Sequence, residues 1–162
     1  MLALLVGDCT TKELAVAHLT PAYLPHDVLG EVIRFTLAYN PGAAFSMSLG
    51  SASRWGFTFL ALVALATLAA VYRSAASEDV LQAGAIALIA GGALGNLIDR
   101  LRSARGVVDF IDVGFGDRRF WTFNVADMGV TCGALLLAWV LWKREQPSGL
   151  RPLESSTTES RE

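Results

Sequence analysis

Residues 80–98 read VLQAGAIALIAGGALGNLI and carry no charged side chain. At about 1.5 Å per residue, a helix of this length covers about 28 Å, close to the thickness of a bilayer's hydrocarbon core, about 30 Å. Ala87, Gly91 and Gly95 recur at four-residue spacing, so small residues share one face, where the backbone of another helix can approach closely. The stretch predicts a membrane-spanning helix with a closely packed neighbour.

Further apolar stretches lie on both sides of this segment. Residues 55–72 are uncharged and are joined to it by residues 73–79, a connection so short that we expect the two helices to be antiparallel neighbours. Residues 125–142 form another span. Residues 1–19 form the fourth, which three charged residues interrupt: Asp8, Lys12 and Glu13. We therefore expect a membrane α-helical fold with four transmembrane helices.

Two longer polar segments, residues 20–54 and 99–122, separate the spans. In the first, residues 33–39 alternate between apolar side chains and others at the period of a half-buried strand. In the second, residues 107–113 form another strand-like piece. Because four spans place both polar segments on the face opposite the termini, we expect them to form a small extracytoplasmic β platform.

The composition is typical of a small integral membrane protein, since 53% of the 162 residues are hydrophobic and only 17% are charged. Residues 1–142 are expected to form one membrane domain, and residues 143–162, rich in Ser, Thr and Glu, a disordered cytoplasmic tail. A net charge of −2 argues against a nucleic-acid-binding surface. The two cysteines and two histidines lack metal-ligand spacing, so no metal and no cofactor is expected.

Two acidic residues stand at the edge of the last apolar stretch. Asp109 lies in GVVDFI, residues 106–111, and Asp127 lies in FNVAD, residues 123–127. A carboxylate near lipid costs roughly 2.5–3.5 kcal/mol on insertion scales, so it usually persists for a function or a partner. Two carboxylates that converge can share one proton, which is the basis of acid–base catalysis.

Each of these residues also has a simpler interpretation, which the residues alone leave open. Asn124, three positions before Asp127, matches the pattern of a helix N-cap with an acid in the first turn, worth about 1 kcal/mol of helix stability. Asp112 and Asp117 are further acidic residues in the same segment as Asp109.

Two pairs at four-residue spacing are further candidates. Asp8 and Lys12 either neutralise one another inside the membrane or support a site. Asn96 and Arg100 either hydrogen-bond across helices and steady the loop that follows, or Arg100 caps the negative end of its helix or pairs with Asp99.

A function of a different class would use some of the same residues. A small proton- or ion-coupled transporter could relay charge through four of them: Asp8, Lys12, Asp109 and Asp127. Against this alternative, the chain has no inverted repeat and no pair of Gly- or Pro-broken helices in matching positions.

Four segments, taken in order, resemble the lipoprotein signal peptidase family, also called signal peptidase II. They are DCTTK at residues 8–12, NPGAAFS at 40–46, GNLIDR at 95–100 with VVDF at 107–110, and FNVAD at 123–127. The resemblance covers nearly the whole chain up to the tail. It departs from the family at Cys9, because Gln usually follows the first aspartate.

The resemblance implies a multi-pass aspartic endopeptidase of the bacterial inner membrane, which removes signal peptides from diacylglyceryl-modified prolipoproteins at the periplasmic side. The family's catalytic pair matches Asp109 and Asp127, which would activate a water without a covalent intermediate. Supporting or substrate-binding positions match Asp8, Lys12, Asn40, Gly42, Asn96, Arg100 and Asn124. The resemblance also implies a monomer that is inhibited by cyclic peptides such as globomycin.

The distribution of arginines conflicts with the orientation that the resemblance implies. Most arginines of residues 1–142 lie in the two polar segments: Arg34, Arg54, Arg100, Arg102, Arg105, Arg118 and Arg119. Counted alone, they would place these segments in the cytoplasm. The resemblance implies instead that both termini are cytoplasmic, with the arginines bound to lipid phosphates or to carboxylates of the loops.

Overall fold

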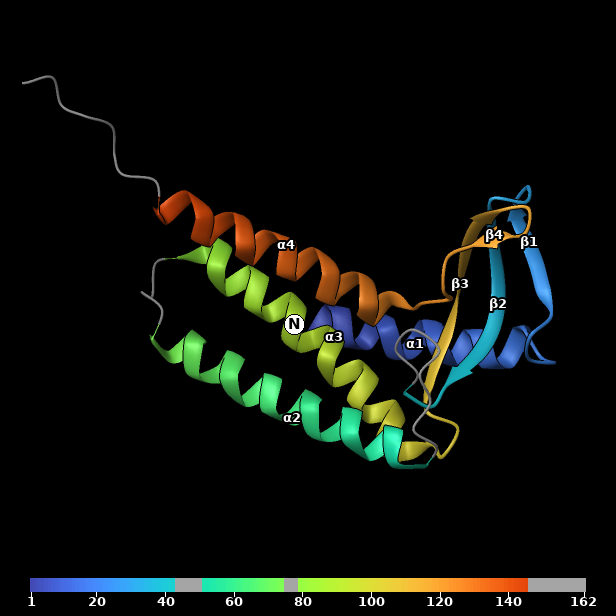
Figure 1. The fold of residues 1–162 in the computed structure, drawn as a ribbon, viewed down its shortest axis with the longest axis horizontal. Helices are drawn as coiled ribbons and strands as arrows, with labels where there is room; N and C mark the ends of the chain where they lie inside the picture. Colours follow the sequence, from blue (N-terminus) through green and yellow to red (C-terminus); the bar gives the residue numbers. More distant parts are fainter. Residues whose placement is uncertain (43–50, 75–78, 146–162) are drawn as a thin grey trace, which may run out of the picture.

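The computed structural model describes residues 1–42, 51–74 and 79–145. In these ranges the chain forms four helices and four strands. They are α1 (Leu2–His18), β1 (Pro25–Leu29), β2 (Ile33–Asn40), α2 (Ser51–Ser74), α3 (Val80–Arg102), β3 (Val107–Phe115), β4 (Arg118–Arg119) and α4 (Val125–Glu145). The helices run side by side, and the sheet lies at one end of them (Figure 1).

Three helices in the described ranges are long and apolar enough to cross a membrane: α2, α3 and α4. The first helix, α1, is not one of them, because its 17 residues include the charged Asp8, Lys12 and Glu13. Asp8 and Lys12 are buried, so α1 turns these charges toward the other helices. The expectation of four helices is confirmed. Of the four membrane spans that were expected, three are found by length and composition in the described ranges.

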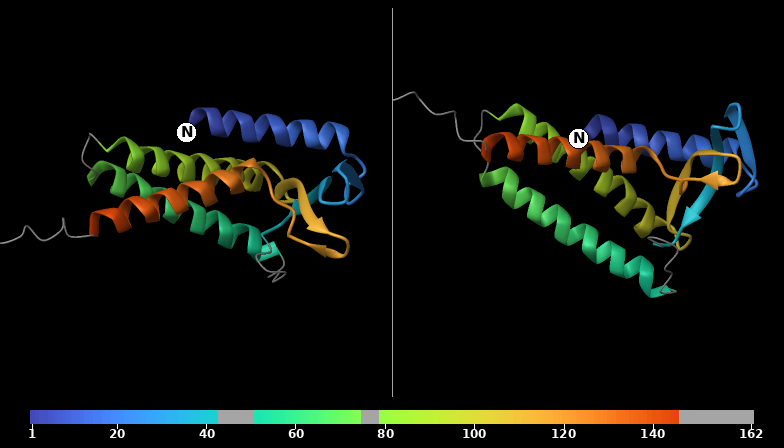
Figure 2. Two further views of the ribbon diagram at one scale, coloured as in Figure 1. Left: turned by 90° about the horizontal axis from the view of Figure 1, so that it is seen from above. Right: turned by 45° about the horizontal axis from the view of Figure 1, so that its top comes forward.

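The central helix is α3, which packs against each of the other helices (Figure 2). Glycines allow this close approach. A Cβ on Gly92 would collide with the backbone carbonyl of Ala126 in α4, and one on Gly95 would collide with the carboxylate of Asp8 in α1. The predicted close packing along the small residues of this helix is therefore confirmed, and it draws polar groups of α1 and α4 against α3.

The four strands form one antiparallel sheet in the order β1-β2-β3-β4. In the central pair, Ala38 of β2 lies opposite Asp109 of β3, and Asn40 lies opposite Val107. The sheet abuts the C-terminal ends of α1 and α3 and the N-terminal end of α4 (Figure 1). A small β platform was expected at this place, although β1 was not predicted.

Several element boundaries differ from the sequence expectations. The third helix continues to Arg102, so the segment expected as residues 99–122 begins later, and Arg100 and Arg102 are helical. Basic residues are stable in a last helical turn because they complement the negative end of the helix dipole. The second helix begins at Ser51, inside the expected polar segment 20–54. The tail expected as residues 143–162 begins with the last turn of α4, and its remainder lies outside the described residues.

Candidate active site

Asp109 lies on β3, where its side chain is buried with only 3% of the residue exposed. The chain brings the start of α4 beside it through Phe123. The backbone N–H groups of Phe110 and Ile111 donate to the Phe123 carbonyl at 3.0 and 2.8 Å, and the Phe123 N–H donates back to Ile111 at 3.0 Å. This pairing places Asn124 next to Asp109.

Asn124 connects the two aspartates. Its side-chain N–H donates to Asp109 Oδ1 at 2.6 Å, and its Oδ1 accepts a hydrogen bond from the Asp127 N–H at 3.0 Å. The Asn124 backbone N–H in turn donates to Asp127 Oδ2 at 3.1 Å. The N-cap interpretation is thus confirmed as a reciprocal capping box, but the same side chain also contacts Asp109. Capping and a role beside the aspartates are therefore compatible.

Asn96 of α3 binds Asp127 from the other side. Its side-chain N–H donates to Asp127 Oδ1 at 2.8 Å. Its Oδ1 accepts two hydrogen bonds, from Lys12 Nζ at 2.9 Å and from the Asn124 side chain at 3.1 Å. Because an amide oxygen accepts and an amide nitrogen donates, these two donors fix which end of Asn96 faces Asp127.

Lys12 anchors this arrangement from α1. Its ammonium lies 2.7 Å from Asp8 Oδ2 and 2.9 Å from Asp99 Oδ2, and the residue is only 3% exposed. With Asn96, it therefore has three acceptors for its three N–H donors. Asp8 also accepts a hydrogen bond from the Ala126 N–H at 2.8 Å, which ties α1 to the first turn of α4.

Asp99 is a part of the site that the sequence interpretation did not single out. Besides binding Lys12, it accepts a hydrogen bond from the Val108 N–H at 3.1 Å and so joins the end of α3 to β3. A pairing of Asp99 with Arg100, one of the alternatives that the sequence left open, is not found among the ion pairs of the described ranges. The sequence did contain a feature that could have identified Asp99 as a site residue. It lies three residues after Asn96, so both side chains are near one face of the helix.

Of two further predicted residues, Asn40 contacts Asp109 and Gly42 contacts Asn40. Asn40 ends β2, and its Oδ1 accepts a hydrogen bond from the Gly42 N–H at 3.0 Å, while its side chain also hydrogen-bonds to Asp109. Gly42 has a φ of 104°, and a Cβ there would lie 2.7 Å from the ring of Phe57 in α2. The turn after β2 therefore needs glycine at position 42 for both its conformation and its contact with α2.

Arg100 supplies a positive charge that acts on both aspartates. It donates to the Asn96 carbonyl oxygen at 3.2 Å and lies over the ring of Phe57, 5.7 Å from the ring centroid. Both Asp109 and Asp127 interact electrostatically with its guanidinium. The structure thus gathers in one place all the residues predicted as site residues: Asp8, Lys12, Asn40, Gly42, Asn96, Arg100, Asp109, Asn124 and Asp127.

The environment of Asp109 favours its protonated form. Burial raises the pKa of its carboxyl from 3.8 to about 7, and the negative charge of Asp127 contributes to this rise. Hydrogen bonds from Asn40 and Asn124 and the charge of Lys12 oppose it. A carboxyl group with a pKa near 7 can hold or release a proton at neutral pH, as acid–base catalysis requires.

The other acidic residues of this segment have different surroundings. Asp112 forms an ion pair with Arg119 at 2.6 Å and accepts a hydrogen bond from Thr36, so it serves the sheet. Asp117 is exposed in the turn between β3 and β4. In the described ranges, no group of three or more His, Cys, Asp or Glu side chains is arranged to hold a metal ion.

A family model described as Signal peptidase (SPase) II matches residues 1–143. The chain belongs to the signal peptidase II family. The lipoprotein signal peptidase of Rhodococcus jostii (strain RHA1) is 39% identical over 153 residues, which cover 91% of this chain and 72% of that protein. The lipoprotein signal peptidase of Hydrogenovibrio crunogenus is 42% identical over 140 residues, covering 83% of this chain and 77% of the relative.

Two solved structures of bacterial membrane enzymes share this fold. A bacterial membrane enzyme solved at 2.3 Å by the in meso method superposes with a TM-score of 0.79 at 28% identity, covering 93% of this chain and 91% of that one. A second, solved at 1.9 Å, has a TM-score of 0.76 at 30% identity and covers 88% and 89% of the two chains. The family and the three membrane-length helices identify the chain as a peptidase of bacterial membranes.

Proposed function

We propose that this chain is an aspartic endopeptidase that removes signal peptides from prolipoproteins, with Asp109 and Asp127 as its catalytic pair. One observation carries the proposal. Two carboxyl groups from separate elements both bind Asn124, whose side chain donates to Asp109 and whose backbone N–H donates to Asp127, and the pKa of Asp109 is raised to about 7. Membership of a peptidase family argues against the transporter alternative.

The surroundings of the two carboxyl groups support complementary roles. Asp127 accepts hydrogen bonds from Asn96 and from the Asn124 backbone, which fix the position of its carboxyl group. Asp109 is buried and favours its proton. Before substrate binds, the pair thus shares one proton held mainly by Asp109, although its apparent pKa values belong to both groups.

Hydrolysis then needs no other chemical group. The ionised carboxylate takes a proton from a water molecule as the water oxygen attacks the carbonyl carbon of the scissile bond. The protonated carboxyl donates a hydrogen bond to the carbonyl oxygen, on which negative charge develops. The proton taken from water passes to the leaving nitrogen as the C–N bond breaks, and the pair returns to one shared proton.

The remaining site residues hold this pair in place. Asn40 and Asn124 donate hydrogen bonds to Asp109, and Asn96 donates one to Asp127. Arg100 balances the negative charge of the pair. Lys12 fixes the orientation of Asn96, and Asp8 and Asp99 compensate the charge of Lys12. Gly42 lets α2 approach the edge of the site closely, and we propose that it shapes the substrate cleft there.

The position of the site fits a substrate with a lipid-modified cysteine. Asp127 lies in the first turn of a membrane-length helix, and Asp109 lies on the adjoining sheet. A diacylglyceryl group can then remain in the bilayer while the peptide bond reaches water at its edge. We assign the site to the periplasmic side of the bacterial inner membrane, and we extend the proposal to a monomer inhibited by globomycin.

A cleavage assay tests the catalytic assignment. The full chain is purified in detergent and given a diacylglyceryl-modified prolipoprotein peptide, with the unmodified peptide for comparison. Asp109→Asn and Asp127→Asn should each lower turnover by at least about a thousandfold because neither variant can cycle a proton between the two groups. The matched control is Asp117→Asn, which removes an exposed carboxylate of the same segment and should leave turnover unchanged. Normal turnover in both catalytic variants would disprove the assignment.

The orientation is tested separately with alkaline phosphatase fused after Lys143, because this enzyme is active only when it is exported. We expect low phosphatase activity, as the C-terminal end of α4 should be cytoplasmic. Two of the loop arginines are bound to carboxylates, Arg34 to Asp27 and Arg119 to Asp112, but the orientation rule counts arginines and not net charge, so the fusion decides. High activity of the fusion would show that the orientation is inverted.

A further inference from the structure

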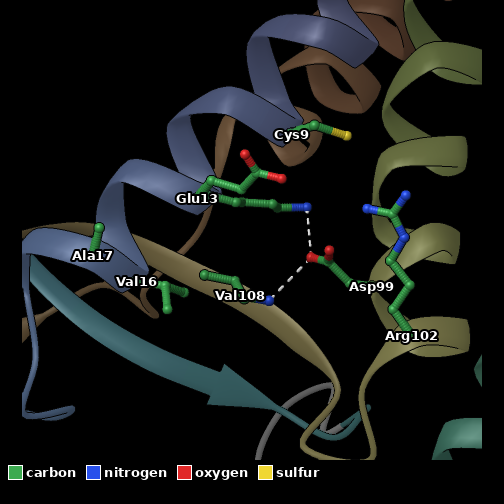
Figure 3. Close-up of a pocket in the computed structure, with 8 residues that line it drawn as sticks. Cys9, Glu13, Val16, Ala17, Asp99, Arg102 and Val108 are labelled. Atoms are coloured by element: carbon green, nitrogen blue, oxygen red, sulfur yellow. Dashed lines mark hydrogen bonds and ion pairs between the residues drawn. The ribbon is translucent and has the colours of Figure 1, made fainter.

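A cavity of about 270 Å³ lies between α1, α3 and β3, and neither Asp109 nor Asp127 lines it. Figure 3 shows Cys9 and Glu13 on α1 facing Arg102 on α3 across this space. Its volume is close to the lower end of small-molecule sites, about 300–1,000 Å³. The cavity can therefore hold a compact polar group, but not a whole lipid or a folded segment.

Two kinds of charge meet in the cavity. Along its inner wall, Lys12 and Asp99 form an ion pair at 2.9 Å, and Lys12 also pairs with Asp8 behind the wall. Nearer to solvent, Glu13 and Arg102 are both exposed, and none of the ion pairs found in the described ranges includes either of them. The open part of the cavity thus presents one uncompensated anion and one uncompensated cation on opposite walls.

The cavity lies at the level where the hydrocarbon core should give way to lipid headgroups. Arg102 is the last residue of a helix long enough to span the bilayer, and β3 begins shortly after it. Val16 and Val108 add apolar surface beside the charges. A ligand at this depth therefore meets both polar and apolar walls, as the glycerol and headgroup region of a phospholipid does.

We propose that this cavity binds the headgroup of a membrane phospholipid that carries a phosphate and a primary ammonium, as in phosphatidylethanolamine. Arg102 would hold the phosphate through its guanidinium, and Glu13 would accept hydrogen bonds from the ammonium. A phosphatidylglycerol headgroup would bring negative charge toward Glu13 without an ammonium to balance it. A phosphatidylcholine headgroup carries a quaternary ammonium, which has no N–H to donate.

The cavity contains its own reporter, because Cys9 lines it and is partly accessible. The chain has two cysteines, so Cys132→Ala leaves Cys9 as the single thiol. This variant is placed in nanodiscs of phosphatidylcholine, alone or with about one third phosphatidylethanolamine or phosphatidylglycerol. The rate at which a small water-soluble maleimide alkylates Cys9 is then measured. We expect the rate to be at least threefold lower with phosphatidylethanolamine than in the other two membranes.

Substitutions at the two exposed charges should change this selectivity in different ways. Glu13→Gln should abolish the difference between phosphatidylethanolamine and phosphatidylglycerol, because the headgroup charge no longer faces a carboxylate. Arg102→Gln should remove the protection by phosphatidylethanolamine, so that the alkylation rate is the same in all three membranes. The matched control is Arg73→Gln, an exposed arginine in the last turn of α2, which should keep the selectivity of the parent.

Two results would overturn the proposal. One is an equal alkylation rate in all three membranes for the parent protein, and the other is an unchanged preference for phosphatidylethanolamine in Glu13→Gln. The measurement needs no peptidase activity, so Asp109→Asn should behave like the parent. Failure of the lipid site and failure of the proposed catalytic pair are therefore separate outcomes.

Discussion

Helices α2 and α3 have similar lengths and similar apolar compositions, yet they have different surroundings. In its most apolar stretch, 44% of the α3 residues are buried in the protein, compared with 6% of those in α2. Among the described helices and strands, α2 packs only against α3, whereas α3 packs against three helices and β3. The apolar character of a helix therefore does not show whether it faces lipid or protein. The buried polar residues show where the protein core lies.

The polar residues buried on α1, α3 and α4 form the stable centre of the molecule. Lys12, Asn96 and Asn124 connect these three helices within hydrogen-bond distance. On α2, by contrast, large apolar side chains such as Phe59 and Leu60 are 70% and 60% exposed. Helix α2 therefore has fewer packed neighbours than α3 to hold it in place.

The largest loss of stability is expected when a charge is removed from the buried polar residues of α1, α3 and α4. Lys12→Met leaves the buried carboxylates of Asp8 and Asp99 without their cation, which should cost about 3–5 kcal/mol of stability. Thermal unfolding in detergent measures this loss. The control on α2 is Phe59→Ala, which should change stability by about 0.5 kcal/mol or less because the ring faces lipid. Equal losses in both variants would contradict the contrast.

A second variant separates a positioning role of Lys12 from a merely stabilising one. In the triple variant Lys12→Met, Asp8→Asn and Asp99→Asn, the uncompensated charges are gone, so much of the stability should return. The loss of the Lys12 charge should nevertheless shift the pH profile of cleavage to higher pH, because that charge lowers the pKa of Asp109. An unchanged profile would limit Lys12 to a stabilising role.

The next effect concerns the proton on Asp109. The folded state binds this proton up to a pH of about 7, whereas an unfolded chain releases it near 3.8. Stability should therefore fall as pH rises from about 4 to 7, in total by on the order of 4 kcal/mol. Asp109→Asn removes this loss, so its unfolding temperature should exceed that of the parent at pH 8 and approach it near pH 4. Parallel pH profiles of the two proteins would contradict the raised pKa.

The same proton should govern the rate of cleavage. If one shared proton is required, kcat/KM should decline as pH rises through about 7, where the pair loses it. This decline belongs to the pair and not to one residue. A rate that stays constant to pH 9 would show that the protonated carboxyl group is not used.

A smaller effect tests the packing of α3 itself. Gly92→Ala places a methyl group against the carbonyl of Ala126 and should cost about 1–3 kcal/mol. Gly84→Ala on the same helix meets no atom within 4 Å and should leave stability unchanged or raise it by up to about 1 kcal/mol. Thermal unfolding of the two variants compares a packed and an open position on the same helix. Similar stabilities would mean that α3 and α4 can move apart at little cost.

Much of the helical architecture was predictable because an apolar stretch of membrane length has few alternatives to a helix. The errors fall at the ends of the elements. Arg100 and Arg102 were assigned to a polar segment because they are charged, although they complete α3. The strand β1 was missed because its five residues, PHDVL, are mostly exposed and show no clear alternation.

The sequence by itself determined the apolar helices, the strands at residues 33–39 and 107–113, and the polar residues that needed an explanation. The order of motifs along the chain also identified the family to which those residues match. The helices and strands are local properties, which depend on residue type and spacing over at most about 20 positions, whereas the order of the motifs extends from residue 8 to residue 127.

Only the tertiary structure decided which polar groups meet. Lys12 contacts Asn96 across 84 positions, and Asp8 contacts Ala126 across 118. No periodicity reports such a distance, because it depends on how closely α1, α3 and α4 approach at Gly92 and Gly95. The raised pKa of Asp109 has the same origin, since burial and the charge of Asp127 arise only when β3 and α4 come together.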